Sequence, residues 1–397
     1  MTRRRVLQII HVTDLHIRDS VFTEQQRFAL EQRIWGRLLS RVCRRTNALE
    51  WAEGTQGHYP AAPRSFRSFL QRLVVVSPKW FADEEGRRPE TWLVCTGDLT
   101  TYGDSRSLEL AETYLAEWLQ ALPGARMRSI YGNHDAWPSC GPGTNIGSLD
   151  ADHAKQISQL QARAGWSPSD WIDAPLSITI PGTANAIELY ALDSIHSTPL
   201  GNIRAIGDLR SADIVKLQQA IAARLTAPGR KSYRILATHH PVTFPYRYMD
   251  THVFGIPGLT KMRLQYAATV QAQLQNIRGV PAVGPLAHLI LSGHSHEQYP
   301  TGKWSPAVVG MRQKGMGESQ LQLVAGPLGL NRGSSAAANT YASGEGCPKP
   351  NCQAEILRFY AADDADEQLI LRRTSVRSIT GHYYGTVTPV QETTVSY

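Results

Sequence analysis

Polar residues with the chemistry of metal ligands follow several short apolar segments of this sequence. Within Tyr131–Asp135, an amide, an imidazole and a carboxylate stand in a row behind Gly132. Such a set is unusual for a plain turn, but it suits a site where an amide oxygen and a ring face a bound metal and its substrate. Four other short blocks supply the further ligands that such a site needs.

Each of the other blocks also ends an apolar segment, so its polar side chains fall at the carboxyl end of a predicted strand. These blocks are D-x-H at Asp14 and His16, G-D at Asp98, T-H-H-P at His239 and His240, and G-H-x-H at His294 and His296. Side chains at i and i+2 share one face of a strand, so the two residues of D-x-H project together. One such block is common and indicates little, whereas five together indicate a shared metal site.

The elements that position these blocks alternate between strands and helices. Apolar and β-branched runs predict strands at 6–13, 91–96, 127–131, 176–180, 186–192, 233–237, 287–291, 321–325, 354–360 and 368–374. Helical spacing predicts helices at 65–76, 107–119, 151–164, 211–225 (with Ser211 as N-cap) and 259–277. This order predicts an α/β fold with polar residues collected at the carboxyl ends of strands.

Two segments depart from the repeating pattern. Residues 20–62 read as an insertion in which 24–48 forms one amphipathic helix or two short ones, suited to a lid or an interface. Residues 376–397 show no clear pattern and read as a C-terminal tail. We therefore predict one domain over 1–375 that carries the insertion, followed by the tail.

Composition excludes some classes of protein and leaves others open. The chain has 397 residues and a net charge of +7, which fits an ordinary surface as well as a phosphate-bearing partner. Its five scattered cysteines argue against a disulfide scaffold, although Cys347 and Cys352 stand close enough to pair or to bind a metal. No apolar run approaches the roughly 18 residues of a membrane helix, and the N-terminal run is too short for a signal peptide. We expect a cytoplasmic protein without a membrane partner.

Taken in order, the five blocks resemble those of the calcineurin-like metallophosphoesterase superfamily, over roughly residues 6 to 330. The resemblance implies a metallophosphoesterase domain built as a four-layer αββα sandwich, with two mixed sheets and two metal ions at the strand ends. It implies that Asp14, His16 and His296 bind one metal, that Asn133, His239 and His294 bind the other, and that Asp98 bridges them. It also implies that His134 sits over the substrate and that Asp135 orients His134.

The chemistry of phosphoester hydrolysis accounts for these residue types independently. Two cations about 3.5–4 Å apart neutralise the phosphate oxygens and acidify a bound water, which attacks phosphorus in line. Mixed carboxylate and imidazole ligands suit divalent or trivalent Mn, Fe or Zn. A carboxylate has two oxygens to share, so Asp98 is the candidate bridge. His134 is placed to stabilise the charge of the leaving oxygen or to protonate it.

Two histidines precede Pro241, and in the family the histidine two positions before the proline is the ligand, which selects His239. His240 then lines the substrate pocket, together with Asn133 and His134, or is a packed histidine. His11 faces away from the D-x-H side by strand alternation and reads as structural.

The motif G-D-L-T-x-x-G over 97–103 resembles the branch with bacterial cyclic-nucleotide and glycerophosphodiester phosphodiesterases, although the insertion departs from that branch. We therefore expect a small-molecule diester as the substrate, with Arg18 and Tyr102 near the ligand blocks as candidate contacts. A DNA-repair-type nuclease is less favoured because no basic run with interleaved aromatics occurs. A phosphomonoesterase or a non-catalytic scaffold on the same fold is also compatible with these residues, and the oligomeric state is not predicted.

Overall fold

The fold is described from a computed structural model of the chain. The structure describes residues 4–17, 62–75, 89–100, 103–136, 149–162, 168–196, 206–226, 229–242, 251–253, 256–260, 269–270, 273–274, 285–294, 321–326, 328, 353–361, 368–378, 384–386 and 391–396.

The first sheet combines parallel and antiparallel strands. Strands β1 (Arg4–Val12), β2 (Glu90–Cys95) and β3 (Arg126–Ser129) run parallel to one another. On the other side of β1, β11 (Gln353–Ala361) pairs antiparallel with it, and β12 (Gln368–Ser378) pairs antiparallel with β11. The three parallel strands therefore end at one edge, where the first three ligand blocks follow them.

The second sheet is also mixed, with strands in the order β10-β9-β6-β5-β4. Its parallel strands are β5 (Ala186–Ala191), β6 (Ser232–Ala237), β9 (Leu289–Ser292) and β10 (Leu321–Val324). The edge strand β4 (Leu176–Thr179) pairs antiparallel with β5, which confirms the predicted hairpin-like pair. The other two ligand blocks follow β6 and β9.

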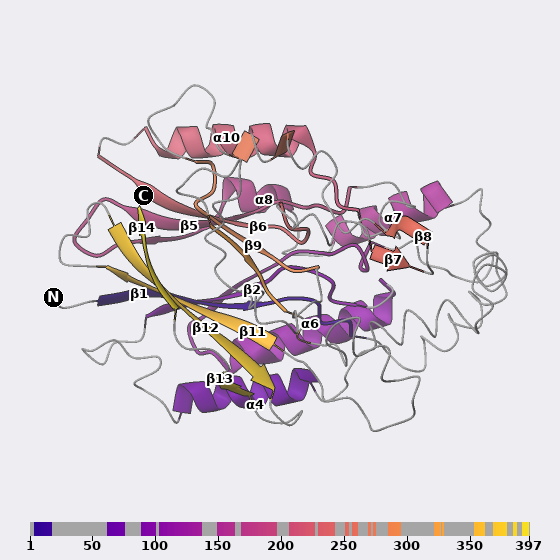
Figure 1. The fold of residues 1–397 in the computed structure, drawn as a ribbon, viewed down its shortest axis with the longest axis horizontal. Helices are drawn as coiled ribbons and strands as arrows, with labels where there is room; N and C mark the ends of the chain where they lie inside the picture. Colours follow the sequence, from indigo (N-terminus) through magenta and orange to yellow (C-terminus); the bar gives the residue numbers. More distant parts are fainter. Residues whose placement is uncertain are drawn as a thin grey trace.

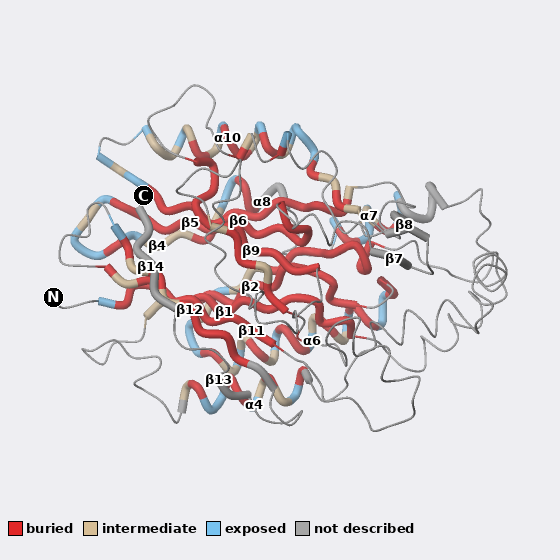
Figure 2. The backbone as a smooth tube through the Cα atoms, viewed as in Figure 1, coloured by how far each residue is buried: buried red, intermediate tan, exposed pale blue. Residues whose placement is uncertain are grey.

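Helices cover the outer face of each sheet. Helices α4 (Ala62–Val75) and α6 (Ser105–Gln120) lie against the first sheet, and α8 (Pro168–Asp173) and α10 (Ser211–Arg224) lie against the second (Figure 1). The two sheets face each other between these helical layers, and their strands β1, β5, β6 and β9 are almost entirely buried (Figure 2). This arrangement confirms the predicted four-layer αββα sandwich.

Alternation of side chains along the strands divides the core into separate layers. On β1, Ile9 packs between the two sheets, in one cluster with Ile235 and Leu289. The next residue, Ile10, packs on the opposite face with Phe66 of α4 and other helical side chains. Each fully buried aliphatic side chain stabilises the fold by about 1.5–3 kcal/mol, so the two-residue period fixes which face of the sheet each helix covers.

Local sequence explains where α6 begins and how α4 packs against it. The side chain of Asp104 accepts a hydrogen bond from the backbone N–H of Ser107 at 2.8 Å and caps α6. Helix α4 turns its apolar stripe to the sheet, and Phe66 meets Trp118 of α6 edge to face, with 4.9 Å between ring centroids. Helix α6, which was predicted over 107–119, begins two residues earlier, at Ser105.

The N-terminus of α10 differs from the prediction. The N-cap is Arg210, which has extended backbone angles and makes no side-chain cap hydrogen bond within the described residues, and Ser211 is the first helical residue. The guanidinium of Arg210 instead donates to the carboxylate of Asp213 at 2.8 Å. Asp213 lies in the first turn, where a negative charge stabilises the helix end. Because the helix already includes Ser211, the prediction of Ser211 as N-cap was wrong.

One predicted helix is partly a strand. Residues 256–260 form β8 (Ile256–Thr260), which pairs antiparallel with β7 (Thr251–Val253), so the helix predicted over 259–277 does not begin at 259. Helical conformation is described within it at 269–270 and 273–274. Backbone groups of 256–260 are satisfied by pairing with β7. The local sequence pattern does not reveal this partner. The helix predicted at 151–164 is confirmed as α7 (Leu149–Ala162).

The C-terminal segment adds strands that the sequence did not predict. Strands β13 (Tyr384–Thr386) and β14 (Gln391–Ser396) both pair antiparallel with β12. The pairing couples the segment predicted as a tail to the first sheet. Short polar strands carry little periodic signal, because their stability depends on the partner strand.

A buried ion pair joins β11 to β12 in the first sheet. The guanidinium of Arg373 donates to both carboxylate oxygens of Glu355, at 2.9 and 3.0 Å, and the hydroxyl of Ser375 completes the set. Both charged side chains are buried. Removing one partner leaves the other charge buried and unpaired, which costs more than the pair itself contributes.

We expect Arg373→Leu to lower the free energy of unfolding by about 3–5 kcal/mol. Arg372→Leu, at the neighbouring and partly exposed position, is the control and should change it much less. Urea denaturation of the two variants measures the difference. A loss below about 1 kcal/mol in Arg373→Leu would show that water or a rearranged partner satisfies Glu355.

Several predictions lie outside the described residues. They are the helix or helices at 24–48 with the rest of the insertion, the Cys347 and Cys352 pair, and the candidate contacts Arg18 and Tyr102. None of the described helices combines the length and apolar character needed to span a membrane.

Candidate metal centre

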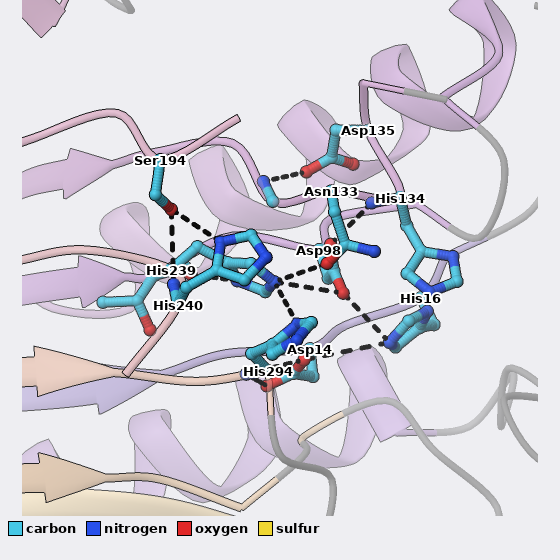
Figure 3. Close-up of polar contacts among 12 residues, drawn as sticks. Asp14, His16, Asp98, Asn133, His134, Asp135, Ser194, His239, His240 and His294 are labelled. Carbon is cyan, nitrogen blue, oxygen red and sulfur yellow. Dashed lines mark hydrogen bonds and ion pairs between the residues drawn. The ribbon is translucent and has the colours of Figure 1, made fainter. Parts of the chain in front are cut away.

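The predicted ligand blocks of both sheets meet at one edge of the sandwich (Figure 3). Each described ligand follows the carboxyl end of a parallel strand, and all of them are buried. They are Asp14 and His16 after β1, Asp98 after β2, Asn133 after β3, His239 after β6, and His294 after β9. The seventh predicted ligand, His296, lies outside the described residues. The structure therefore brings together six of the seven residues.

Four candidate ligand atoms converge at the position predicted for the second metal. The Nε2 atom of His239 lies 3.1 Å from Oδ1 of Asn133 and 3.1 Å from Nδ1 of His294. It also lies 3.3 Å from Oδ2 of Asp98. Ligand atoms that share one ion with bonds of about 2.1 Å are separated by about 3.0–3.4 Å. The spacing of these atoms fits a bound cation.

The other nitrogen of His239 explains how its ring is oriented. Its Nδ1 lies 2.7 Å from the carbonyl oxygen of Thr96, which can only accept. Nδ1 therefore carries a hydrogen, and Nε2 is the ring atom that faces the centre. Burial opposes the charged ring, but the Asp98 carboxylate outweighs burial and raises the pKa of His239 to about 9 without a metal. Metal binding at this ring must then release a proton.

The position predicted for the first metal is wider. Nε2 of His16 lies 3.9 Å from Oδ1 of Asp14 and 3.8 Å from Oδ2 of Asp98. The carboxylate of Asp14 also accepts a hydrogen bond from the backbone N–H of His294 at 3.0 Å, which ties the first sheet to the second. Two carboxylates and an imidazole from neighbouring strand ends form a mixed oxygen and nitrogen site of the kind that Mn, Fe or Zn occupies.

Asp98 stands between the two positions. Its Oδ1 accepts a hydrogen bond from the backbone N–H of His134 at 2.9 Å, whereas its Oδ2 accepts none within the described part of the chain. Burial alone would raise its pKa, but the rings of His239 and His134 outweigh burial and lower it well below the ordinary value. Its Oδ2 faces Nε2 of His239 at 3.3 Å and Nε2 of His16 at 3.8 Å, so one oxygen lies between the two predicted ligand groups. Asp98 thus fits the predicted bridging role.

Backbone strain marks the same residues. Among the described residues other than glycine, four have positive φ angles, and all four are predicted ligands: Asp14, His16, Asp98 and His294. The left-handed region is costly for residues with a Cβ and persists where surrounding structure enforces it, often at functional sites. The fold therefore aims these side chains at the centre against their local preference.

Glycine beside the ligands permits the close approach of the loops. Gly97 has a φ of +99°, and a Cβ there would lie 2.7 Å from the backbone nitrogen of Gly132. At Gly132 itself, a Cβ would overlap the carboxylate of Asp98. The glycines of G-D and G-N-H-D are needed because the loops after β2 and β3 touch at this point.

Asp135 has partners that the sequence did not predict. Its carboxylate accepts hydrogen bonds from the backbone N–H groups of Leu99, Thr100 and Gly132 and from the hydroxyl of Thr100, at 2.8–3.0 Å. None of its described hydrogen bonds goes to His134, which it was expected to orient. Burial and the charge of Asp98 raise its pKa to about 7. Asp135 joins the loops that carry Asp98 and Asn133, so it positions ligands.

Two histidines outside the predicted ligand set, His134 and His240, also face the centre. The ring of His134 meets that of His16 edge to face, with 4.8 Å between centroids, and it is nearly buried. His240 groups with His239 and His294, because one nitrogen of each ring lies within 4.8 Å of the others. The sequence did not predict the partner of His240, Ser194, which follows β5 and carries no motif.

A buried histidine next to the centre makes stability depend on pH. Nε2 of His11 lies 2.9 Å from the hydroxyl of Thr96, consistent with the structural role predicted for it. Burial lowers its pKa from 6.5 to about 3. The unfolded chain takes up this proton below pH 6.5 and the folded chain does not until about pH 3, so stability present above pH 6.5 is lost as the pH falls through this window.

For the metal-free protein, we expect the fall in unfolding free energy from about pH 6.5 to about pH 4.5 to be about 2–3 kcal/mol smaller in His11→Gln than in the wild type, from about 1.4 kcal/mol per pH unit. Urea denaturation at several pH values measures the two slopes. Equal slopes would show that His11 is charged in the folded state.

A family model described as calcineurin-like phosphoesterase matches residues 7–298. The chain belongs to this family. The family and the His and Asp clusters together indicate a dinuclear metal site. The branch within the family is not assigned by this match. Among curated proteins, none matches the sequence.

Two of the solved structures that resemble the chain are a phosphatase and a putative nucleotidase, both at low identity. One is a purple acid phosphatase from yellow lupin (Lupinus luteus) seeds, at 12% identity and a TM-score of 0.44, covering 100% of this chain and 54% of that one. The other is a putative 5′-nucleotidase from Staphylococcus aureus, at 9% identity and a TM-score of 0.34, covering 98% of this chain and 54% of that one. The chain spans about half the length of both.

Proposed function

We propose that this protein is a dinuclear metal-dependent phosphoester hydrolase that acts on small-molecule phosphodiesters. The observation that carries the proposal is the position of Asp98, a buried carboxylate with one oxygen facing ligand groups on both sides. His134, an imidazole outside the predicted ligand set, lies beside His16 and Asp98. Mn, Fe or Zn suits the mixed oxygen and nitrogen donors.

The chain's own residues would hold the metals and the substrate. When bound, the two metals would neutralise the phosphate oxygens and activate water. Asp14, His16 and His296 would hold one ion, and Asn133, His239 and His294 the other, with Asp98 shared. If Oδ1 of Asn133 binds metal, its amide nitrogen remains a donor for a phosphate oxygen. Asn133 would then both hold metal and orient substrate.

His134 would supply the proton that the leaving oxygen needs. An alkoxide is a poor leaving group, and a positioned general acid accelerates its departure by about 10²–10⁴-fold. The backbone N–H of His134 donates a hydrogen bond to Asp98. This bond fixes the backbone of His134 relative to the proposed bridging carboxylate. Asp135 holds the same loop through Gly132.

The preference for diesters rests on the sequence motif G-D-L-T-x-x-G over 97–103, which resembles the diesterase branch. A dinuclear centre by itself serves monoesters and diesters alike, so phosphomonoesterase activity is the main competing function. A nuclease acting on DNA would use the same centre, and a non-catalytic scaffold would use the same fold. The scaffold is disfavoured because every predicted ligand and His134 are present in the sequence.

Hydrolysis of bis(p-nitrophenyl) phosphate and of p-nitrophenyl phosphate, measured side by side with Mn²⁺ and with chelator, tests the proposal. We expect metal-dependent cleavage with higher kcat/KM for the diester. Preference for the monoester would assign a phosphatase. A protein that binds two metals and cleaves neither would support the scaffold function.

A further inference from the structure

His240 is held in place by groups that are not part of the predicted ligand set. Its Nδ1 lies 2.8 Å from the hydroxyl oxygen of Ser194, which also accepts the backbone N–H of His240 at 3.3 Å. Gly207 packs against the ring so closely that a Cβ there would overlap Cγ and Nδ1 of His240. The backbone N–H of Asp208 donates to the carbonyl oxygen of Ser194 at 2.9 Å, which joins the two segments that hold the ring.

The second ring nitrogen of His240 faces the centre. The side chain is fully buried, and its Nε2 makes no hydrogen bond within the described part of the chain. Its ring centroid lies 4.2 Å from that of His294 and 4.9 Å from that of His239. Figure 3 shows one edge of the ring turned to Ser194 and the other turned to the cluster around His239.

The surroundings of Nε2 favour a lone pair at this atom. If Nε2 carried the hydrogen, a buried donor would have no acceptor among the described residues, which is destabilising. If Nδ1 donates its hydrogen to Ser194, Nε2 presents a lone pair to the other ligand atoms, and a cation satisfies it. Metal-binding histidines commonly donate their other ring N–H in this way, as His239 does to Thr96.

We propose that Nε2 of His240 is an additional ligand of the metal held by Asn133, His239 and His294, and that Ser194 and Gly207 position it. This inference rests on the proposed dinuclear centre. It gives the second position three imidazoles, one amide oxygen and one carboxylate oxygen. A donor set this rich in nitrogen favours Fe or Zn over Mg at that position.

Titration of the metal-depleted full-length protein with Co²⁺ tests the inference without relying on activity. The visible spectrum of Co²⁺ changes with the number and type of its ligands, and the titration gives stoichiometry and Kd. The variants are His240→Gln, Ser194→Ala and Gly207→Ala. The matched control is His288→Gln, which removes a buried ring before β9, where its Nδ1 accepts the backbone N–H of Arg234 at 2.9 Å.

We expect two Co²⁺ per chain in the wild type and in His288→Gln, with the same spectrum. In Ser194→Ala, which keeps the ring, one of the two Co²⁺ should lose about 10–100-fold in affinity, the usual effect of removing a group that orients a ligand. His240→Gln should lose at least as much and should change the spectrum. Gly207→Ala should resemble His240→Gln, because it displaces the ring.

Unchanged Kd and spectrum in His240→Gln would overturn the inference and leave His240 as a packing residue. If that variant does not fold, an unchanged spectrum and Kd in Ser194→Ala would overturn it instead. Failure of the wild type to bind two Co²⁺ would overturn the proposed dinuclear function itself. The wild type thus tests the dinuclear centre, and the variants test the role of His240.

Discussion

Replacing Asp98 with Ala is expected to release metal from both positions and to reduce turnover to background. Its Oδ2 lies 3.8 Å from Nε2 of His16 on one side and 3.3 Å from Nε2 of His239 on the other. Loss of the carboxylate removes a ligand from each position and leaves Asp14 as the one carboxylate among the described predicted ligands. Elemental analysis of the purified variant measures the metal content.

Asp98→Asn distinguishes loss of the bridging carboxylate from loss of the hydrogen bond that holds the loop with His134. The amide oxygen can still accept the N–H of His134, but a neutral amide is a poor ligand for two cations at once. We expect a folded protein with at most one equivalent of metal. Asp173→Ala, which removes an exposed carboxylate paired with Lys216, should keep two equivalents. Two equivalents bound in Asp98→Ala would refute the bridging role.

Replacing His134 with Ala is expected to leave metal content near that of the wild type while turnover falls by about 10²–10⁴-fold, the usual scale for a general acid. The ring adjoins His16 edge to face, but it belongs to none of the predicted ligand positions. The backbone N–H of residue 134 would still bind Asp98, so the loop should keep its place. Elemental analysis and steady-state kinetics on one preparation measure both quantities.

The leaving group offers a sharper test of the role of His134. A p-nitrophenolate departs without a proton, whereas an alkoxide needs one, so the His134→Ala defect should be larger for an alkyl diester than for bis(p-nitrophenyl) phosphate. An equal defect on both substrates would point to substrate binding or charge stabilisation. Unchanged turnover would remove His134 from the mechanism.

The sequence by itself determined the chemistry of the centre and most of the regular elements. Few residue types bind metals, so D-x-H, G-N-H-D and G-H-x-H, each after an apolar run, were recognisable together as parts of one metal site. The carboxyl ends of parallel strands meet at one edge of a sheet, so blocks far apart in sequence could be assigned to one site. Burial on both faces made β1, β2 and β6 recognisable as apolar runs. The four-layer fold came from resemblance, and the structure confirms it.

Only the tertiary structure decided contacts that depend on distant partners. Asp135 binds backbone groups 35 and 36 residues away, and a carboxylate gives no sequence signal of its hydrogen-bond donors. The ring of His240 is oriented by Ser194, 46 residues earlier, and no motif connects them. Strands β13 and β14 exist because β12 offers them a partner, and β8 exists because β7 does. Local patterns fix residue type and period, whereas pairing and hydrogen-bond geometry arise only when the chain is folded.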